Sequence, residues 1–469
     1  MIEEIVTVNL LVGNMNMNDS SWKNTERLDL NSLELKKMQF KMLKKQLTRV
    51  YDESPYYKEK FDLAGVNPHE FSSLEQYKDY PMFDKYEERE SQALSLKEQG
   101  HPLGMHLTCN IRDVNRMSAS SGTTGTPSFQ GHTANDRKII ERNFTRMAKM
   151  TGLRAGDKVL MAGVMSMWVA GLPTVDALLS YGANVIPIGG LVGSAKVIEM
   201  IQLTRPEVII CTPSFARQLL KKSKTELNID LSQFCVRKLV VYGEPGGSVP
   251  EIVKELSEGF GGAEIFDMSG GTGCLNPIFA QCSEHDGMHF IAPDSAYIEL
   301  YDRNAGKVIP FEDGAVGEFV YTDFDRECGP LIRFMDGDKM RVNMKPCKCG
   351  LAGMRFEILG RVDDMLLIKG VNVFPSAVRD LVMSFQGEVT GNVRIVKGSD
   401  SPVIEPPMIV KVECVGEPDS KALAELKQRL ETIIQRQLRF KANIVLFYEG
   451  ELPMEYGATG KIKLLETSS

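Results

Sequence analysis

The chain has 469 residues, 43% of them hydrophobic and 25% charged, with a formal net charge of −7. This length exceeds what one hydrophobic core usually serves, so two or more domains are expected. The acidic balance argues against a nucleic-acid-binding protein, which would usually show a basic patch. The sequence holds no run of about 18 apolar residues, so no membrane-spanning helix is expected.

The N-terminus and the cysteines bear on location. Residues 1–4 (MIEE) lack the basic start of a secretory signal, and residues 1–30 read as a polar, irregular extension. Nine cysteines, an odd number in a long chain, fit reduced thiols better than a disulfide framework. A cytoplasmic protein is therefore expected.

Helical and strand patterns then alternate along the chain. Residues 33–52 have helical periodicity, and shorter helices are expected between residues 62 and 87. Helical segments separate four short apolar runs, at 158–162, 184–188, 207–211 and 238–242. This alternation predicts parallel strands with crossover helices. Residues 297–320 instead predict antiparallel strands with turns between them.

The pattern resets after residues 360–364, where a small α+β unit begins. The predicted fold class is therefore α/β: a large N-terminal domain of mixed sheets with crossover helices, then a small α+β C-terminal lid domain. The expected divisions are an extension over 1–30, the large domain over 31–360 and the small domain over 361–469.

Residues 118–127 (SASSGTTGTP) combine hydroxyl groups and glycines in a loop. Glycines let backbone N–H groups converge on one point and the hydroxyls add donors, so the loop predicts a cradle for phosphate oxygens. It is not a Walker A motif, because Thr126 and Pro127 follow Gly125 where that motif needs Lys-Ser/Thr. By itself the run could also be a solvated polar loop.

With the segments downstream, the chain resembles the phenylacetate–CoA ligase family of the adenylate-forming superfamily, from about residue 35 to 465. The superfamily loop reads SSGTTGKPT, and residues 120–128 read SSGTTGTPS, with Thr126 in place of the lysine. The resemblance implies that the phosphate-binding residues of this loop are Ser120, Ser121, Gly122, Thr123, Thr124 and Gly125.

Residues 360–375 (GRVDDMLLIKGVNVFP) carry the most family-specific match, to the pattern GRxDDMLIxRGVNVFP. The resemblance implies that Arg361 contacts ribose or phosphate. It makes Asp363 the hinge about which the small domain rotates. Gly370 is then expected to line the path of the CoA pantetheine arm.

Two strand ends add nucleotide-binding candidates. Residues 242–245 (YGEP) match the family's GAEP, which implies adenine and ribose contacts from Gly243, Glu244 and Pro245; a simple strand-to-helix turn is the alternative. Residues 266–270 (FDMSG) match the superfamily's Tyr-Gly-x-Thr/Ser-Glu.

That second match assigns adenine stacking to Phe266 and an α-phosphate contact to Ser269. It puts Gly270 where the superfamily has its Mg²⁺-binding glutamate. Mg²⁺ prefers carboxylate and phosphate oxygens, so this change weakens the site. Asp267 is a candidate substitute.

Two further charged residues match family motifs. Residues 331–338 (LIRFMDGD) resemble IRYxTGD, which implies that Asp338 accepts hydrogen bonds from the ribose diol. Residues 457–463 (GATGKIK) resemble TGKIx(R/K). The match implies that Lys461, rather than Lys463, neutralises charge developing during adenylation.

A tight C-x-C pair, Cys347 and Cys349, and an upstream C-x₆-H pair, Cys282 and His289, suit a closed tetrahedral Zn²⁺ site. Relatives of phenylacetate–CoA ligase look similar here. His285 is the competing ligand, and buried free thiols are the alternative.

Two other features have no family match. For His132 a core or surface role is expected rather than catalysis. Trp168 and residues 165–167 follow a strand and could line an acyl pocket or be ordinary packing.

The resemblance implies an AMP-forming carboxylate–CoA ligase acting on an aromatic or aryl-acetic acid, with ATP, Mg²⁺, CoA as co-substrate and a structural Zn²⁺. An amide ligase with an amine acceptor shares every motif. A nucleotide-binding protein without catalysis is a third reading, since Thr126 and Gly270 remove charged groups from the phosphate site. No nucleic-acid or membrane partner is expected, and a homodimer is the statistical default.

Overall fold

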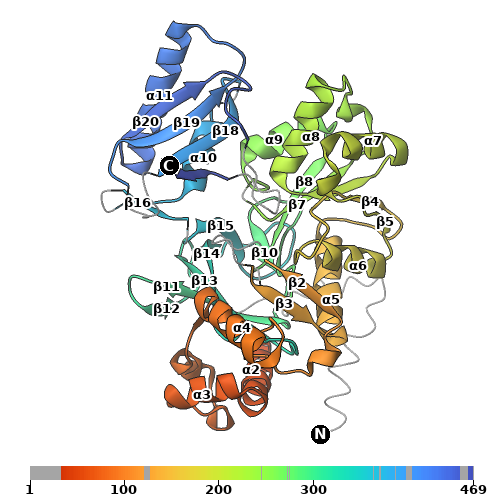
Figure 1. Ribbon diagram of the computed structural model, residues 1–469, viewed down its shortest axis with the longest axis vertical. Helices are drawn as coiled ribbons and strands as arrows, with labels where there is room; N and C mark the ends of the chain where they lie inside the picture. The colour runs from red at the N-terminus through yellow and green to blue at the C-terminus, as the bar shows by residue number, and fades with distance from the viewer. Residues whose placement is uncertain are drawn as a thin grey trace.

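A mixed sheet of 13 strands forms the centre of the molecule (Figure 1). Its strand order is β12-β11-β13-β14-β15-β10-β9-β8-β7-β6-β4-β5, with β1 beside β14. The computed structural model describes residues 33–120, 127–244, 246–271, 273, 275–362, 364–368, 371–385, 387–397, 404–454 and 463–467. Within these ranges, no helix is both long enough and apolar enough to cross a membrane.

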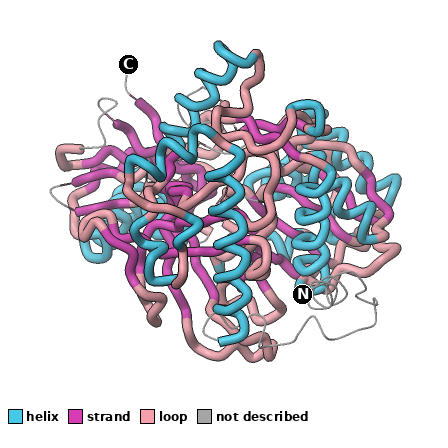
Figure 2. Tube along the Cα trace, turned by 90° about the horizontal axis from the view of Figure 1, so that it is seen from below, coloured by secondary structure: helices cyan, strands magenta, loops and turns pink. Residues whose placement is uncertain are grey.

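One half of the sheet is parallel, as its apolar runs predict. Its strands are β4 (Lys158–Met161), β5 (Asn184–Ile186), β6 (Val208–Cys211), β7 (Lys238–Tyr242) and β8 (Glu264–Ser269). The helices around them are α5 (Ala134–Met150), α6 (Leu172–Tyr181), α7 (Ser194–Thr204), α8 (Pro213–Thr225) and α9 (Pro250–Gly259). Figure 2, seen from below, shows helices on both sides of these strands.

Alternate strand residues face the two helical layers. Val159 and Met161 pack in the core that α5 and α6 cover, whereas Leu160 packs in the core of α7, α8 and α9. Strands buried on both faces read as continuous apolar runs, which is why the sequence showed them. The predicted parallel strands with crossover helices are confirmed.

The other half of the sheet is antiparallel. It consists of β9 (Phe279–Gln281), β10 (Met288–Phe290), β11 (Ala296–Asp302), β12 (Lys307–Ile309), β13 (Val316–Asp323), β14 (Phe334–Asn343) and β15 (Arg355–Arg361). The short β1 (Phe83–Asp84) joins it in parallel with β14. An aromatic core beside it is covered by α2 (Leu33–Glu53) and α3 (Pro55–Leu63).

Between these helices and the parallel half lie α4 (Lys85–Gln99) and a hairpin of β2 (Arg116–Ala119) and β3 (Phe129–His132). The hairpin flanks the predicted phosphate loop. Backbone hydrogen bonding from Ser120 N to Ser128 O, at 2.8 Å, closes the neck of that loop.

The C-terminal part has its own core and sheets. Strands β16 (Leu366–Ile368) and β17 (Val371–Val373) pair with each other. A second sheet, in the order β20-β19-β18-β21, contains β18 (Val389–Lys397), β19 (Met408–Cys414), β20 (Ala442–Phe447) and β21 (Leu465–Thr467). Helices α10 (Pro375–Met383) and α11 (Ser420–Leu438) pack with them (Figure 1). Arg217 on α8 reaches this part, donating to Thr390 O at 2.5 Å.

Candidate active site

A cavity of about 340 Å³ opens where several strands of the parallel half end. Ser120 follows β2, Gly243 follows β7, and Ser269 and Arg361 end β8 and β15. Ligands of α/β proteins bind at the carboxyl ends of parallel strands. The fold therefore brings four of the predicted nucleotide-binding residues to one cavity.

The cavity has two kinds of lining, which we name by their residues. The polar wall consists of Lys85, Arg89, Ser120, Gly243, Ser269, Gly270 and Arg361. The apolar wall consists of Ile140, Phe144, Val164, Trp168, Val169, Ala170 and Pro173.

Strand register joins Arg361 to Asp338 in the polar wall. The two residues are paired across β14 and β15, and Arg361 Nη1 lies 3.1 Å from Asp338 Oδ1. Burial, and then the nearby Asp336, raise the pKa of Asp338 to about 7, against the lowering by Arg361. Asp338 itself is not among the residues that line the cavity.

Two basic residues of the polar wall, Lys85 and Arg89, belong to no motif in the sequence analysis. They stand one turn apart at the start of α4, where Asp84 caps the helix. Lys85 Nζ lies 3.3 Å from Asp336 Oδ1, and Arg89 Nε is buried without a hydrogen-bond partner. Their i, i+4 spacing on one helix face was the only signal in the sequence.

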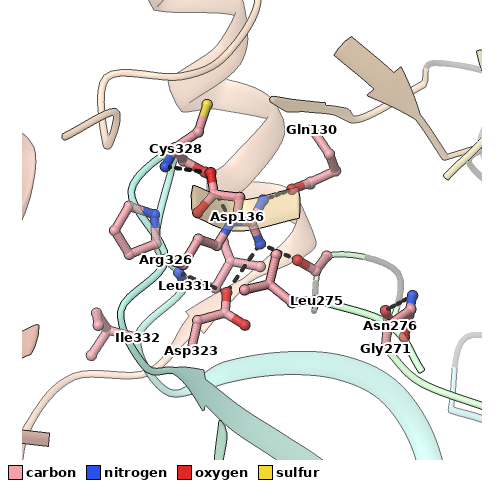
Figure 3. A network of polar contacts seen from close by, with 12 residues as sticks. Gln130, Asp136, Gly271, Leu275, Asn276, Asp323, Arg326, Cys328, Leu331 and Ile332 are labelled. Atoms are coloured by element: carbon pink, nitrogen blue, oxygen red, sulfur yellow. Dashed lines mark hydrogen bonds and ion pairs between the residues drawn. The ribbon is translucent and has the colours of Figure 1, made fainter. Parts of the chain in front are cut away.

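A buried arginine fixes the floor of the cavity (Figure 3). Arg326 is 1% exposed; it donates to Gln130 and, at 3.0 Å, to Asp323. It also donates to the backbone carbonyls of Gly273 and Cys328. Burial raises the pKa of Asp323 to about 6, against the lowering by Arg326. Because Gln130 and Gly273 both line the cavity, this network holds two parts of its surface together.

The expected Mg²⁺ position is closed by a neighbour. A Cβ added at Gly270 would lie 1.7 Å from Asn276 Oδ1. Asn276 is itself held by donating from Nδ2 to Gly271 O at 2.9 Å. The amide of Asn276 therefore occupies the space that a side chain at position 270 would need.

Besides Asp338, three predicted nucleotide-binding residues are not among those that line the cavity. Phe266 is 1% exposed, with its ring 5.0 Å from that of His285. Asp267 accepts from Ser248 Oγ at 2.9 Å, and burial raises its pKa to about 7. Glu244 accepts from Ser214 N at the start of α8, at 2.6 Å. Adenine stacking on Phe266 and metal binding by Asp267 therefore lack support from this arrangement.

The apolar wall comes from α5, from the segment between β4 and α6, and from the first turn of α6. Ala119 N donates to Met167 O at 2.7 Å, and Ala119 bridges to Trp168, which draws this segment toward the phosphate loop. Trp168 lines the cavity, whereas the neighbouring Met167 is 47% exposed. The sequence is compatible with Trp168 either in an acyl pocket or in ordinary packing, and the structure places Trp168 in the cavity lining.

The four predicted metal ligands meet in space. The ligand atoms of Cys282, His289, Cys347 and Cys349 all lie within 4.8 Å of one another. Cys282 Sγ is 3.6 Å from Cys347 Sγ, and Cys349 Sγ is 3.5 Å from His289 Nε2. The competing His285 instead packs on Phe266. Four such ligands fit tetrahedral Zn²⁺.

The remaining predicted residues lie outside the described ranges. They are Ser121, Gly122, Thr123, Thr124, Gly125, Pro245, Asp363, Gly370 and Lys461.

The chain is similar to known enzymes both in sequence and in fold. The chain matches no family model. It is 30% identical to a phenylacetate–coenzyme A ligase of Thermus thermophilus, over 92% of this chain and 95% of the relative. It is also 30% identical to that of Escherichia coli K12, over 75% and 77%.

A solved structure of 2-hydroxyisobutyryl-CoA ligase in its postadenylation state has a TM-score of 0.85 at 24% identity, covering 97% of this chain and 94% of that one. An open conformation of the same ligase, which covers 97% and 96%, scores 0.71, also at 24% identity. The chain shares its fold with adenylate-forming CoA ligases and belongs to the phenylacetate–coenzyme A ligase family.

Proposed function

We propose that the protein is an AMP-forming carboxylate–CoA ligase that activates an aromatic or aryl-acetic acid. ATP and the acid give an acyl-adenylate and pyrophosphate, and CoA then takes the acyl group and releases AMP. The observation that carries this proposal is one cavity with a polar wall at the strand ends and an apolar wall including Phe144 and Trp168. Such a site can hold a nucleotide phosphate beside an apolar acid.

The polar wall supplies charge for adenylation. The reaction itself needs mainly positioning and electrostatic stabilisation of the phosphoryl group. Lys85 and Arg89 supply cations on the wall of the cavity, which offsets the loss of the loop lysine at Thr126. Lys461 is proposed to neutralise charge between the carboxylate and the α-phosphate.

The expected Mg²⁺ position lacks its usual carboxylate ligand. Position 270 has no carboxylate, Asn276 fills its space, and Asp267 is bonded to Ser248 away from the cavity. A carboxylate at position 270 therefore plays no part in the proposed adenylation.

The C-terminal part is proposed as a lid that rotates about Asp363 between the two half-reactions, exchanging Lys461 for the Gly370 loop. Its separate core is compatible with such movement, and polar contacts such as Arg217 to Thr390 join it to the large part in this arrangement. The higher TM-score against the postadenylation form than against the open form supports an arrangement nearer to the former.

The cysteine–histidine cluster is proposed to hold a structural Zn²⁺. The cluster links three parts of the chain that are far apart in sequence: the residue after β9, strand β10, and the connection between β14 and β15. We expect one zinc per chain by elemental analysis, and a lower unfolding temperature after chelation or in Cys347→Ser. Zinc-free protein of unchanged stability would contradict the proposal. Cys235→Ser, at an exposed thiol outside the cluster, is the control.

The decisive experiment is ATP–pyrophosphate exchange across a panel of carboxylic acids, followed by loss of free CoA thiol. Exchange with an aryl acid and thiol loss are expected. Exchange without thiol loss, but with an amine acceptor consumed, would favour the amide ligase. If no acid supports exchange, the result would favour a nucleotide-binding protein without catalysis. The cytoplasmic location and the homodimer stay predictions of the sequence.

A further inference from the structure

Two cysteines outside the zinc cluster lie in contact with each other. Cys109 belongs to the segment between α4 and β2 and is half-buried, whereas Cys328 follows shortly after the buried Arg326 and is only 1% exposed. Their thiols share a hydrogen bond. Neither sulfur takes part in the proposed zinc site or in the proposed reaction, so this pair of thiols has no role assigned so far.

Hydrogen bonds hold the two cysteine-bearing segments side by side. Arg49 on α2 donates from Nη2 to Thr108 Oγ1 at 2.7 Å and to Arg326 O at 2.6 Å. Thr108 Oγ1 in turn donates to Glu327 O at 2.8 Å. Because Thr108 and Glu327 immediately precede the two cysteines, these contacts keep the sulfur-bearing residues together.

The two thiols differ in reactivity and in access. The hydrogen bond from Cys328 lowers the pKa of the Cys109 thiol, against burial and nearby carboxylates such as Asp136. The same hydrogen bond, and then burial, raise the pKa of the Cys328 thiol. A Cβ added at Gly131 would lie 2.3 Å from Cys328 Sγ, so β3 covers that sulfur. Since the thiolate is the reactive form, Cys109 is the sulfur that an oxidant meets first.

The backbone of Cys328 is tied to the floor of the cavity (Figure 3). Its carbonyl accepts from Arg326 Nε at 2.9 Å, and its N–H donates to Asp136 Oδ2 at 3.1 Å. Arg326 also holds Gln130 and Gly273, which both line the cavity. A disulfide draws two sulfurs from hydrogen-bond contact to covalent distance. Bonding of Cys328 to a partner therefore shifts the backbone on which this network depends.

We propose that Cys109 and Cys328 form a redox switch, in which a peroxide joins them in a disulfide that disturbs the cavity floor and slows adenylation. The effect on activity rests on the proposed ligase function, whereas formation of the disulfide does not.

The oxidation has two steps. The Cys109 thiolate attacks one peroxide oxygen, the O–O bond breaks, and a sulfenic acid forms as hydroxide leaves. The sulfur of Cys328 then attacks the sulfenic sulfur, the S–O bond breaks, and a second hydroxide leaves. The two thiol protons turn the two hydroxides into water. The two sulfurs lose two electrons and the peroxide gains them, and a dithiol reductant reverses the change.

Peptide mapping of the oxidised full chain tests the disulfide. The reduced protein is treated with hydrogen peroxide, its remaining thiols are blocked, and it is digested without reductant for mass spectrometry. We expect cross-linked peptides carrying Cys109 and Cys328, lighter than the reduced pair by two hydrogens. ATP–pyrophosphate exchange should fall roughly fivefold or more as this cross-link accumulates, and recover with dithiothreitol.

Two serine variants separate this pair from the other thiols. Cys109→Ser should exchange as the wild type before oxidation, because residue 109 is not among those that line the cavity. It should keep that rate at a peroxide concentration that cross-links the wild type fully. Cys235→Ser, at an exposed thiol outside the pair, should cross-link and lose exchange as the wild type does.

Three results overturn the inference. They are the absence of a Cys109–Cys328 cross-link after oxidation, a cross-linked protein that exchanges at the reduced rate, and a Cys109→Ser variant that peroxide inactivates as fast as the wild type. The wild-type peptide map and exchange rates decide the first two even if the variant does not fold. Failure of the proposed function is distinct, because the reduced wild type then exchanges with no acid while the cross-link still forms.

Discussion

The polar wall and the apolar wall of the cavity are built by different means. Residues of the polar wall stand at or next to strand ends or on a helix start, and ion pairs hold Lys85 and Arg361. The apolar wall comes from one helix face, a connecting segment and the first turn of a second helix, where shape alone matters. Phosphate and ribose restrict the residue types that bind them, whereas an apolar acid restricts only volume. The two walls should therefore respond to mutation on different substrates.

Arg361→Ala should have the largest effect, and on ATP. The variant removes a cation from the polar wall and takes from the half-buried Asp338 the guanidinium that lies 3.1 Å from its carboxylate. Losing a hydrogen-bonded charge costs up to about 3 kcal/mol, so kcat/KM for ATP should fall roughly hundredfold. Initial rates of pyrophosphate exchange over a range of ATP concentrations measure this.

Arg341→Ala is the matched control. Arg341 lies on β14, the strand paired with β15 of Arg361, and forms an exposed pair with Glu357 at 2.7 Å. Exposed pairs contribute about 0–1 kcal/mol, so this variant should behave as the wild type. Equal effects of the two variants would remove Arg361 from the nucleotide site.

Trp168→Ala should act on the acid instead. Truncating an aromatic side chain of the apolar wall removes contact area, and about 2 kcal/mol of binding corresponds to a roughly thirtyfold lower kcat/KM for an aryl acid. KM for ATP should stay within about twofold. Met167→Ala, at the exposed neighbour, is the control. A Trp168 variant that raises KM for ATP and for acid equally would show that the two walls are not separate in function.

The difference between the polar wall and the apolar wall also explains which features of the fold and the site could be predicted from the sequence. The apolar runs of β4, β6 and β7 predicted parallel strands because burial on both faces demands continuous apolar residues. Five residues of the polar wall could be found from motifs, whereas Lys85 and Arg89 could not. The place of His132 could not, because its access to the cavity depends on how the β2–β3 hairpin is seated. The sequence already favoured His289 over His285 as a metal ligand, and the pairing of β10 with β9 and β15 belongs to the arrangement that brings it to the cysteines.

Gly270→Glu tests the closed metal position of the polar wall. Because the new Cβ would meet Asn276 Oδ1 at 1.7 Å, we expect a loss of about 2 kcal/mol of stability and no gain in Mg²⁺ affinity. Gly270→Glu combined with Asn276→Gly should recover part of the stability and bind Mg²⁺ more tightly. Denaturant unfolding and the Mg²⁺ dependence of exchange measure the two effects, with Asn276→Gly alone as control. Tighter Mg²⁺ binding by the single variant would contradict this account of Asn276.

Asp267→Asn concerns stability and its dependence on pH rather than substrate use. Its carboxyl has a pKa of about 7 in the folded protein, because of burial, against an ordinary value of 3.8. The folded state therefore keeps a proton that the unfolded chain releases, so stability falls as pH rises between about 4 and 7. Asparagine does not titrate, and the variant should gain on the wild type by up to about 1.4 kcal/mol per pH unit in this window.

Urea unfolding at several pH values checks this prediction, with Glu258→Gln, at an exposed site of α9, following the wild type throughout. A gap between Asp267→Asn and the wild type that does not change with pH would mean that the carboxyl is already ionised at pH 5. Pyrophosphate exchange separates the remaining alternative. If Asp267→Asn abolishes Mg²⁺-dependent exchange, this carboxylate reaches the phosphate site in another arrangement of the protein, and the polar wall then extends beyond the cavity lining. If Asp267→Asn retains exchange, the role of Asp267 is structural: its carboxyl group accepts a hydrogen bond from Ser248 and stabilises β8.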